Sequence, residues 1–451
     1  MNVDGSHFTV IVVGAGQAGL AMSGALRRRG IEHLVLERHR VAHEWSSRRW
    51  DSFCLVTPNW QCTLPDFPYA GSDPDGFMGR EQIVEYLLGC VEALEVPLQE
   101  GVTVTRLRRL GEEGFELTTT AGTLTADQVV VSTGPYQVPR IPRSAERLAG
   151  SVASLHSSQY RNPDRLPAGD VLVVGTGQSG CQIAEDLHLS GRRVHLATGS
   201  APRVARRYRG RDVVAWLADI GYYRKTIEEF DDADAVRFRV NHYVTGRDGG
   251  RDIDLRAFAR DGMCLYGRLT DIVAPTGGRG ATASFADDLR VNLDRADAVS
   301  ESIKDSIDDW IAANSMRAPS ELRYTPVWEP RAAATELDLA AAGVGSVVWS
   351  TGFGRDDRWV EVPIFDGRGY PAHRRGVTAC PGLYFLGLPW QWTWGSGRFC
   401  GVGEDALHLA ARIEELHHSG VGAAVRWIAG PPAARFTVEA DDEWVAPRTV
   451  A

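Results

Sequence analysis

The stretch Ile11-Val12-Val13-Gly14-Ala15-Gly16-Gln17-Ala18-Gly19 is an apolar strand that runs into the pattern G-x-G-x-x-G at the start of a helix. The same pattern returns in Val171-Leu172-Val173-Val174-Gly175-Thr176-Gly177-Gln178-Ser179-Gly180. A strand, glycine turn and helix in this order are typical of a site that binds one dinucleotide. Two such units in one chain predict two dinucleotides held face to face, with electron transfer between them.

The composition is that of a globular protein with a large core. The 451 residues leave room for two or three domains, and 43% of them are hydrophobic and 24% charged. The formal net charge of −9 argues against nucleic acid as the main partner. The first residues do not show a basic segment followed by an apolar one, as a signal peptide would, and no apolar run is long enough to span a membrane. We therefore expect a cytoplasmic protein that acts on small molecules.

Each glycine of the first unit has its own physical role. Gly14 permits the tight turn, Gly16 lets the backbone approach a pyrophosphate, and Gly19 lets the helix pack against the strand. The helix predicted over residues 18–29 holds phosphates through free N–H groups and its dipole. The next strand, residues 31–37, ends in Glu37, where a ribose-binding carboxylate belongs.

Position in the chain favours FAD over NAD for this unit, because the turn opens the chain and a second unit follows. The expected cofactor-binding residues here are Gly14, Gly16, Gln17, Ala18, Gly19, Glu37, Arg38 and Trp45.

The second unit differs at the position equivalent to Glu37. The strand over residues 193–197 ends at Thr198, and arginines follow in place of an acid. An acid would repel a 2′-phosphate, whereas arginine accommodates it, so NADPH is favoured over NADH. Alternatively, these arginines only solvate a loop. The expected NADPH-binding residues are Gly175, Gly177, Gln178, Ser179, Gly180, Thr198, Arg203, Arg206 and Arg207.

The segments around the two units predict an α/β fold with two Rossmann-like dinucleotide-binding domains. Residues 81–94 read as an amphipathic helix, and residues 102–107, 115–120 and 122–124 as short strands. A buried strand, residues 129–134, ends in Thr133-Gly134, and a matching one, residues 347–353, contains Thr351-Gly352. We interpret these Thr-Gly segments as paired crossings between the domains, and include all four residues among the cofactor-binding candidates.

The domain prediction is a FAD-binding domain of residues 1–150 and 330–451 and an NADPH-binding domain of residues 151–329. Residues 209–326 look like an insertion, either a lid over the active site or an arm that makes a homodimer. Within it, residues 294–314 predict a surface helix whose polar face carries Lys304. A last strand over residues 383–387 precedes a helix from residue 401 to about 417, whose N–H groups can face the flavin. The tail after Gly430 is expected to be peripheral.

Seven cysteines are present without a C-x-x-C or C-x4-C pair. A disulfide reductase needs such a pair beside the flavin, so that class is not favoured. No metal site is expected either. Electrons must pass from NADPH through flavin to another acceptor, and molecular oxygen is the commonest one for this domain pair.

At this point the chain resembles class B flavoprotein monooxygenases, in particular the flavin-containing and YUCCA-like branch. The two glycine turns and the two Thr-Gly segments are shared with Baeyer–Villiger relatives. The segment Val56-Thr57-Pro58-Asn59-Trp60, followed by Asp66-Phe67-Pro68, looks like the T-N…D-F-P region of the family. Residues 155–160, Leu-His-Ser-Ser-Gln-Tyr, look like the end of the motif F-x-G-x-x-x-H-x-x-x-[FYW].

The resemblance implies two catalytic candidates. Asn59 matches an asparagine that faces the flavin and helps to hold the peroxide adduct, with Pro58 as an inserted residue. His156 matches the motif histidine, with a role either in positioning the linker or only at a domain junction. The motif departs upstream, where Leu148 replaces Phe and Gly150 precedes His156 by six positions in place of four.

The implied function is an NADPH- and O2-dependent monooxygenase that forms a C4a-(hydro)peroxyflavin and oxygenates a small substrate at nitrogen or another soft nucleophile. The alternatives are a flavin reductase or oxidase without oxygen insertion, a Baeyer–Villiger-type enzyme, and a non-enzymatic flavoprotein that senses redox state. The cluster Trp390, Trp392 and Trp394 either walls a substrate pocket or shields the flavin.

Overall fold

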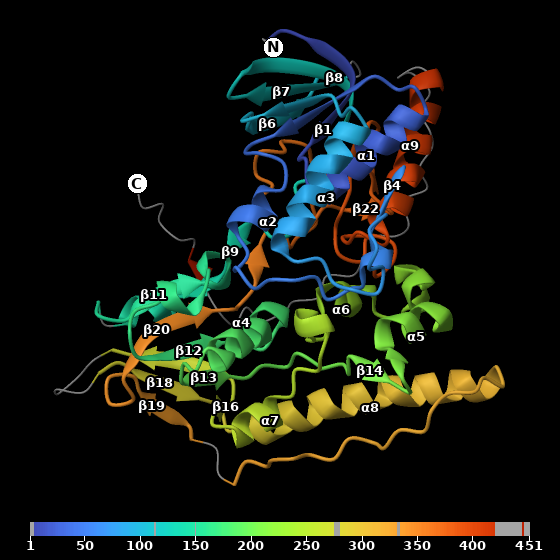
Figure 1. Cartoon of the computed structure of the whole chain (residues 1–451). Helices are drawn as coiled ribbons and strands as arrows, with labels where there is room; N and C mark the ends of the chain where they lie inside the picture. The colour runs from blue at the N-terminus through green and yellow to red at the C-terminus, as the bar shows by residue number, and fades with distance from the viewer. Residues whose placement is uncertain are drawn as a thin grey trace.

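The computed structural model describes residues 4–111, 114–148, 150–274, 280–331, 334–419 and 444–445. It contains two α/β units joined by a short waist, one above the other in Figure 1. The α/β fold with two Rossmann-like units is as predicted. Among the described residues, no helix is both long and apolar enough to cross a membrane.

The first unit is built on a sheet with the order β22-β23-β24-β8-β1-β2-β5, to which β7 and β6 add a meander beside β8. The strands β24, β8, β1, β2 and β5 are parallel, with Val12 paired to both Val35 and Val130. Helices α1, α3 and α9 lie together on one face (Figure 1). The strands are β1 (His7–Val13), β2 (His33–Glu37), β5 (Leu98–Glu100), β6 (Val104–Arg109), β7 (Phe115–Thr119), β8 (Gly122–Val131), β22 (His373–Arg374), β23 (Val377–Thr378) and β24 (Leu383–Phe385), and the helices α1 (Gln17–Arg28), α2 (His43–Ser47), α3 (Arg80–Ala93) and α9 (Val402–Ser419).

The predicted elements of this unit are found within a few residues of their expected bounds. One difference concerns β8, which is a single ten-residue strand, Gly122–Val131, where two short strands were predicted. Its first half pairs with β7 and its second half with β1, so the strand runs on from one half to the other without a turn between them.

The second unit is a parallel sheet with the order β11-β20-β12-β13-β16, beside a three-stranded antiparallel sheet, β17-β18-β19. Helices α4 and α7 and the N-terminal part of α8 pack on the parallel sheet. The elements are β11 (Ala153–His156), β12 (Asp170–Val174), β13 (Val194–Ala197), β16 (Cys264–Tyr266), β17 (Leu269–Val273), β18 (Thr282–Phe285), β19 (Glu336–Asp338), β20 (Val344–Trp349), α4 (Gln178–Leu189), α7 (Leu255–Arg260) and α8 (Leu289–Ala313).

Two boundaries differ from the prediction. Strand β20 pairs with β11 and β12, so the chain leaves the second unit after Trp349 rather than near residue 330. Strands β16, β17 and β18 fall inside residues 209–326, so this range is not one insertion. Two separate excursions overlap this range: the first, residues 207–260, lies between β13 and β16, and the second, residues 286–331, lies between β18 and β19.

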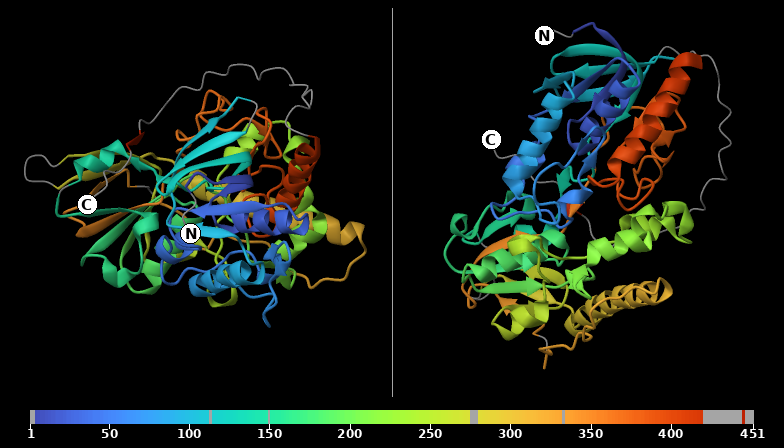
Figure 2. Two further views of the ribbon diagram at one scale, coloured as in Figure 1. Left: turned by 90° about the horizontal axis from the view of Figure 1, so that it is seen from above. Right: turned by 45° about the vertical axis from the view of Figure 1, so that its right-hand side comes forward.

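The two excursions pack on each other. The first contains α5 (Val213–Ile220) and α6 (Ala233–Phe238), which lie between the first unit and α8 (Figure 1; Figure 2, right). Trp216 of α5 meets Trp310 of α8, with ring centroids 6.0 Å apart. Lys304, expected on the polar face of this helix, is buried, because its ammonium pairs with Glu301 and lies over the Tyr208 ring.

The paired crossings predicted from the two Thr-Gly segments are present. Strand β9 (Val138–Pro139) follows Gly134, and β21 (Phe353–Gly354) follows Gly352. They pair antiparallel, Phe353 to Pro139 and Gly354 to Val138. A second contact at this waist is β10 (Ile141–Pro142) with β25 (Trp444–Val445). Apart from β25, the tail after Gly430 lies outside the described residues.

A single buried carboxylate, Asp186 of α4, ties three segments together. It accepts hydrogen bonds from Ser52 Oγ at 2.7 Å and Tyr160 Oη at 2.7 Å, and an Arg247 guanidinium nitrogen lies 2.9 Å away. Ser52 belongs to the first unit, Tyr160 follows β11, and Arg247 belongs to the first excursion. Asp186 therefore fixes the second unit against the first.

We predict that Gly19→Ala destabilises the fold. A Cβ atom at this position would lie 1.8 Å from the Gly14 carbonyl oxygen. The expected loss in unfolding free energy is about 3 kcal/mol or more, at the upper end of the cost of overpacking, measured by urea denaturation of the apoprotein. Gly367→Ala is the control, since a Cβ there meets nothing within 4 Å. Equal stability of the two variants would contradict the close approach of α1 to the turn.

We predict that Asp186→Ala lowers the unfolding free energy by about 2–3 kcal/mol, because three donors lose their acceptor and the partner Arg247 is only partly exposed. Ser52→Ala removes one of the three hydrogen bonds and is expected to cost about 1 kcal/mol. Denaturant midpoints followed by tryptophan fluorescence compare the two. A loss no larger in Asp186→Ala than in Ser52→Ala would rule out the shared role of the carboxylate.

Candidate functional site

The two glycine turns have nearly the same geometry. Gly14 and Gly175 have φ values of +106° and +101°, which side chains rarely adopt. A Cβ on either would lie 2.7 Å from a backbone oxygen, that of Ser132 or Ser350. The third glycine of each turn is equally constrained, since a Cβ on Gly180 would lie 1.9 Å from the Gly175 oxygen. Backbone conformation and close packing are therefore enough to require glycine at these four positions, whether or not a ligand binds.

The middle glycines, Gly16 and Gly177, are different because they are sterically open. Nothing lies within 4 Å of a Cβ built on Gly16, and one on Gly177 meets only Val240. Both residues are helix N-caps in extended conformation, with no side-chain cap and no acid in the first helical turn. Free N–H groups at a helix N-terminus, with open space before them, suit an anion such as a diphosphate. Both turns therefore fit a dinucleotide.

The acid predicted to bind a ribose, Glu37, lies beside the first glycine turn. The Glu37 carboxylate accepts hydrogen bonds from Ala15 N and His39 N, both at 2.9 Å, at the end of β2. Arg38 is exposed and lies 3.8 Å from Glu44. Ala18 is buried. Glu37 thus joins the turn to the loop after β2, where the ribose of a dinucleotide is expected.

A glycine-rich segment of the C-terminal part lies against the start of α1. The Gln17 amide donates to Gly397 O at 3.3 Å, and a Cβ on Gly387 would lie 2.7 Å from that of Ala18. Trp45 stacks with Phe399, with ring centroids 5.9 Å apart. These contacts place residues from the N-terminal and the C-terminal parts of the chain side by side at the expected flavin site.

The residues of the Thr-Gly segments have structural partners at the waist. The Gln137 amide donates to Thr133 Oγ1 at 3.1 Å and to Gly134 O at 2.9 Å. Thr351 Oγ1 donates to Arg140 O at 2.5 Å, and Arg140 N donates to Gly352 O at 3.0 Å. They therefore hold the two crossings in register.

Asn59 lies in a 3₁₀ turn, Asn59–Gln61, and is almost fully buried. Its amide nitrogen donates to Asp73 O at 2.9 Å, and its amide oxygen accepts from Met78 N at 2.7 Å. Both ends of the side chain thus hold the loop over residues 73–78. In this structure Asn59 braces that loop.

His156 has no exposed surface and lies at the waist. Its Nε2 lies 3.0 Å from Gly352 O, and its Nδ1 accepts from Ser158 N at 3.2 Å, so the proton is assigned to Nε2. Burial, with a smaller effect of the Arg48 charge, lowers the pKa of His156 to about 4. A neutral imidazole with both nitrogens engaged fits the domain-junction role.

The side chains predicted to receive a 2′-phosphate have other partners. Thr198 is buried, and its hydroxyl donates to Tyr266 O at 2.8 Å. Arg203 lies 2.8 Å from Asp297, and Arg206 lies 2.6 Å from Asp212. Buried ion pairs of this kind leave these two guanidiniums unavailable to a phosphate. Of this set only Arg207 is exposed, and Gln178 and Ser179 remain at the turn.

The tryptophan cluster meets the first excursion. Phe230 packs on Trp390 and Tyr223 on Trp394, with ring centroids 5.3 and 4.8 Å apart. The backbone joins here too, since Ile227 N donates to Trp392 O at 2.7 Å. These aromatic residues of the excursion were missed from the sequence, because they carry no motif. The lid and the homodimerisation alternatives both stay predictions.

The seven cysteines are all free thiols. Burial raises the pKa of Cys54 to about 11 and that of Cys62 to about 12, the latter with a smaller effect of Cys400. Burial raises the pKa of Cys400 to about 11. Thiols kept protonated are poor nucleophiles. The described residues also contain no group of three or more potential metal ligands.

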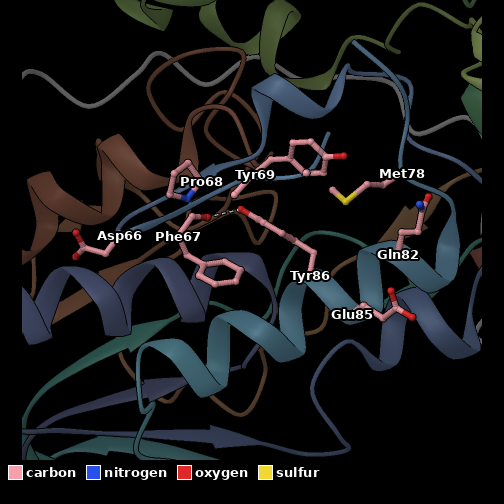
Figure 3. Close-up of a pocket in the computed structure, with 10 residues that line it drawn as sticks. Asp66, Phe67, Pro68, Tyr69, Met78, Gln82, Glu85 and Tyr86 are labelled. Atoms are coloured by element: carbon pink, nitrogen blue, oxygen red, sulfur yellow. Dashed lines mark hydrogen bonds between the residues drawn. The ribbon is translucent and has the colours of Figure 1, made fainter. Parts of the chain in front are cut away.

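A cavity of about 490 Å³ lies beside the Asp66-Phe67-Pro68 motif (Figure 3). It is bounded by the hairpin of β3 (Thr63–Leu64) and β4 (Phe67–Pro68) and by α3, and Tyr86 Oη donates to Phe67 O at 2.6 Å in its wall. Residues of neither glycine turn line it. The lining residues are Asp66, Phe67, Pro68, Tyr69, Ala70, Gly71, Met78, Gln82, Glu85 and Tyr86.

Sequence comparisons agree with this architecture. The profile of the pyridine nucleotide-disulphide oxidoreductase family matches residues 11–284. An uncharacterized CzcO-like oxidoreductase of Geobacillus kaustophilus is 31% identical, over 91% of this chain and 98% of the relative. Indole-3-pyruvate monooxygenase YUCCA1 of Oryza sativa is 31% identical, over 43% of this chain and 48% of the relative.

Solved structures share the fold over the same extent. A flavin-containing monooxygenase from Stenotrophomonas maltophilia superimposes with a TM-score of 0.61 at 18% identity, covering 91% of this chain and 99% of that one. The ornithine N-hydroxylase of Kutzneria, solved with reduced FAD, NADP+ and ornithine, has a TM-score of 0.59 at 16% identity, covering 91% and 99%. The predicted resemblance to flavin-containing and YUCCA-like monooxygenases is thereby confirmed. Its glycine turns, its fold and its relatives together show that the chain is an oxidoreductase of the pyridine nucleotide-disulphide oxidoreductase family.

Proposed function

We propose that this protein is a monooxygenase that binds FAD at the first glycine turn and NADPH at the second, and oxygenates a small substrate at nitrogen or another soft nucleophile. The observation that carries the proposal is the pair of open, uncapped turns, one on each side of the waist. The likeness to indole-3-pyruvate monooxygenase YUCCA1 and to the flavin-containing monooxygenase of Stenotrophomonas maltophilia supports it. Over the whole reaction, NADPH supplies two electrons, one oxygen atom enters the substrate, and the other leaves as water.

The chain's own residues would bind and align the two dinucleotides. The N-terminus of α1 and Glu37 would hold the diphosphate and ribose of FAD, and the N-terminus of α4 the diphosphate of NADPH. Bound flavin would accept the hydride and pass the electrons to oxygen. Asp186 and His156 are positioning residues in this scheme, because they fix the two units through Ser52 and Gly352.

The first excursion would exclude water from the flavin. Phe230 and Tyr223 pack on the tryptophan cluster, and that cluster follows directly on β24 of the flavin-binding unit. Exclusion of water favours oxygen transfer over release of peroxide.

One observation favours a second candidate, an NADPH oxidase that releases hydrogen peroxide. The Asn59 amide is already committed to the loop over residues 73–78. An oxygenase of the proposed kind needs a donor beside the reactive oxygen, and this structure assigns that amide elsewhere.

The oxygenation itself is tested by rapid mixing of NADPH-reduced protein with oxygenated buffer. We expect a transient absorbance distinct from both the oxidised and the reduced flavin, and less than one peroxide per NADPH when a suitable amine is present. Direct return of the oxidised spectrum with one peroxide per NADPH, for every amine, sulfide and ketone tried, would favour the oxidase.

The assignment of the two cofactors is tested by Gly16→Ala and Gly177→Ala. Both positions have extended backbone and room for a methyl group, so both variants are expected to fold with wild-type thermal stability as apoproteins. The methyl group would displace the diphosphate and weaken binding by roughly tenfold or more. Flavin content should fall in Gly16→Ala only, and NADPH affinity of the flavin-loaded protein in Gly177→Ala only. The reverse pattern would exchange the two assignments.

A further inference from the structure

A cluster of hydrogen-bond donors lies where the first excursion meets the C-terminal part of the chain. Tyr370 precedes β22 and His373 begins it, and their ring centroids are 5.8 Å apart. Helix α6 of the excursion packs on the same place. The centroid of the Phe238 ring lies 5.6 Å from that of Tyr370, and the Arg237 guanidinium lies 5.2 Å from the Tyr370 ring. Two segments far apart in the sequence thus form one cluster.

Three donor atoms of this cluster have no hydrogen-bond acceptor within the described part of the chain. They are Tyr370 Oη, His373 Nε2 and Arg237 Nε, and all three are almost inaccessible to solvent. His373 Nδ1 accepts from Gly376 N at 3.3 Å, so the imidazole proton is assigned to Nε2. A buried donor without an acceptor costs free energy. The cluster is therefore suited to a ligand that accepts several hydrogen bonds at once.

The two neutral groups of the cluster keep their donor protons near neutral pH. Burial raises the pKa of Tyr370 to about 12, against the smaller opposing effect of the Arg237 and Arg355 charges. Burial, followed by the charges of the same two arginines, lowers the pKa of His373 to about 3. Tyr370 is therefore a phenol and His373 a neutral imidazole, and each offers one donor.

The carboxylates beside the cluster already have partners. Asp234 pairs with Arg237 at 3.0 Å and with Arg368 at 3.2 Å. Asp357 is buried and pairs with Arg355 at 2.7 Å. Both guanidiniums of the cluster thus face one carboxylate each, which leaves little net positive charge. A singly charged anion suits such a site better than a dianion, because a second buried charge would stay uncompensated.

Arg355 connects the cluster to the carboxyl ends of the first sheet. Its guanidinium lies 3.4 Å from Gly134 O, shortly after β8, and 6.0 Å from the Phe385 ring at the end of β24. These two strands are parallel neighbours, with Val131 paired to Phe385. Open α/β sheets bind their ligands outside the carboxyl ends of the strands. The cluster therefore borders the region where the first unit is expected to hold its ligands.

We propose that Arg237, Tyr370 and His373 bind a carboxylate group of the substrate. The assignment rests on the proposed function and narrows its substrate to an organic carboxylate. The diphosphates of the two dinucleotides have their own sites at the glycine turns, so the anion at this cluster is a different one. A carboxylate has two oxygens with about four lone-pair sites, enough to accept from a guanidinium, a phenol and an imidazole together.

The experiment is isothermal titration of the oxidised, flavin-loaded protein with benzoate at constant ionic strength. Benzamide, its neutral analogue, and inorganic phosphate are titrated separately. We expect benzoate to bind, and benzamide and phosphate to bind at least tenfold more weakly. Tyr370→Phe and Arg237→Gln are each expected to raise the Kd of benzoate about tenfold or more, as for a lost hydrogen bond to a charged group.

Arg368→Gln is the matched control. Arg368 pairs with the same Asp234 and lies over the Phe238 ring, but it is exposed. Its loss is expected to leave the Kd of benzoate within twofold of the wild-type value. Thermal unfolding without benzoate separates a structural role, because removal of a hydroxyl that has no partner in the protein is expected not to lower the midpoint of Tyr370→Phe.

Four results would overturn the assignment. They are absence of benzoate binding, tighter binding of phosphate than of benzoate, an unchanged Kd in Tyr370→Phe and Arg237→Gln, and an equal loss in Arg368→Gln. Reduction of the flavin by NADPH is followed in the same preparation. Reduction without benzoate binding refutes this site alone, whereas benzoate binding to a protein that NADPH does not reduce refutes the proposed function and leaves the carboxylate site standing.

Discussion

The carboxylate of Asp186 is the interaction on which the alignment of the two units depends. It sits on α4, the helix whose N-terminus forms the second glycine turn, and it accepts a hydrogen bond from Ser52 of the first unit. Any rotation of α4 that displaces the second turn therefore also strains this bond and the one to Tyr160. Transfer between two bound groups requires their reacting atoms to lie within about 3–3.5 Å. A rigid link between the helix and the opposite unit meets that demand better than the short crossings alone.

The link is strong because it is buried and shared. Two neutral hydroxyls and one guanidinium satisfy the carboxylate, so the charge is not left uncompensated in the interior. The exposed pairs between the first excursion and the C-terminal part, Glu228 with Arg374 and Asp234 with Arg368, contribute much less. The apolar contacts of Phe230 and Tyr223 with the tryptophan cluster hold the excursion in place there.

Sequence reasoning predicted the parts of this molecule that local physics determines. The glycine turns could be read directly, because Gly14 and Gly175 are required by a backbone conformation and Gly19 and Gly180 by a close approach within one short segment. Side-chain availability could not be read in this way. Arg203 is paired with Asp297, which no local pattern connects to it. The position of β20 in the second sheet was missed for the same reason. The apolar sequence of this strand fits the first sheet as well as the second, and only its pairing with β12 decides between them. Asn59 was predicted to face the flavin, but both ends of its amide bond to a loop that the sequence could not position.

The two units are therefore unequal in a way that the turns themselves do not reveal. Glu37 belongs to the first turn's own second strand, so that unit carries its recognition group within the βαβ segment. In the second unit the equivalent position, Thr198, faces the sheet interior and bonds to Tyr266. The first excursion lies beside that turn, since its residue Val240 meets the Gly177 position while its residue Phe230 meets Trp390. One segment thus contacts both the dinucleotide turn and the aromatic wall beyond β24. A ligand at the second turn that favours this position of the excursion also stabilises the closed wall by the same free energy, because coupling between two sites is reciprocal.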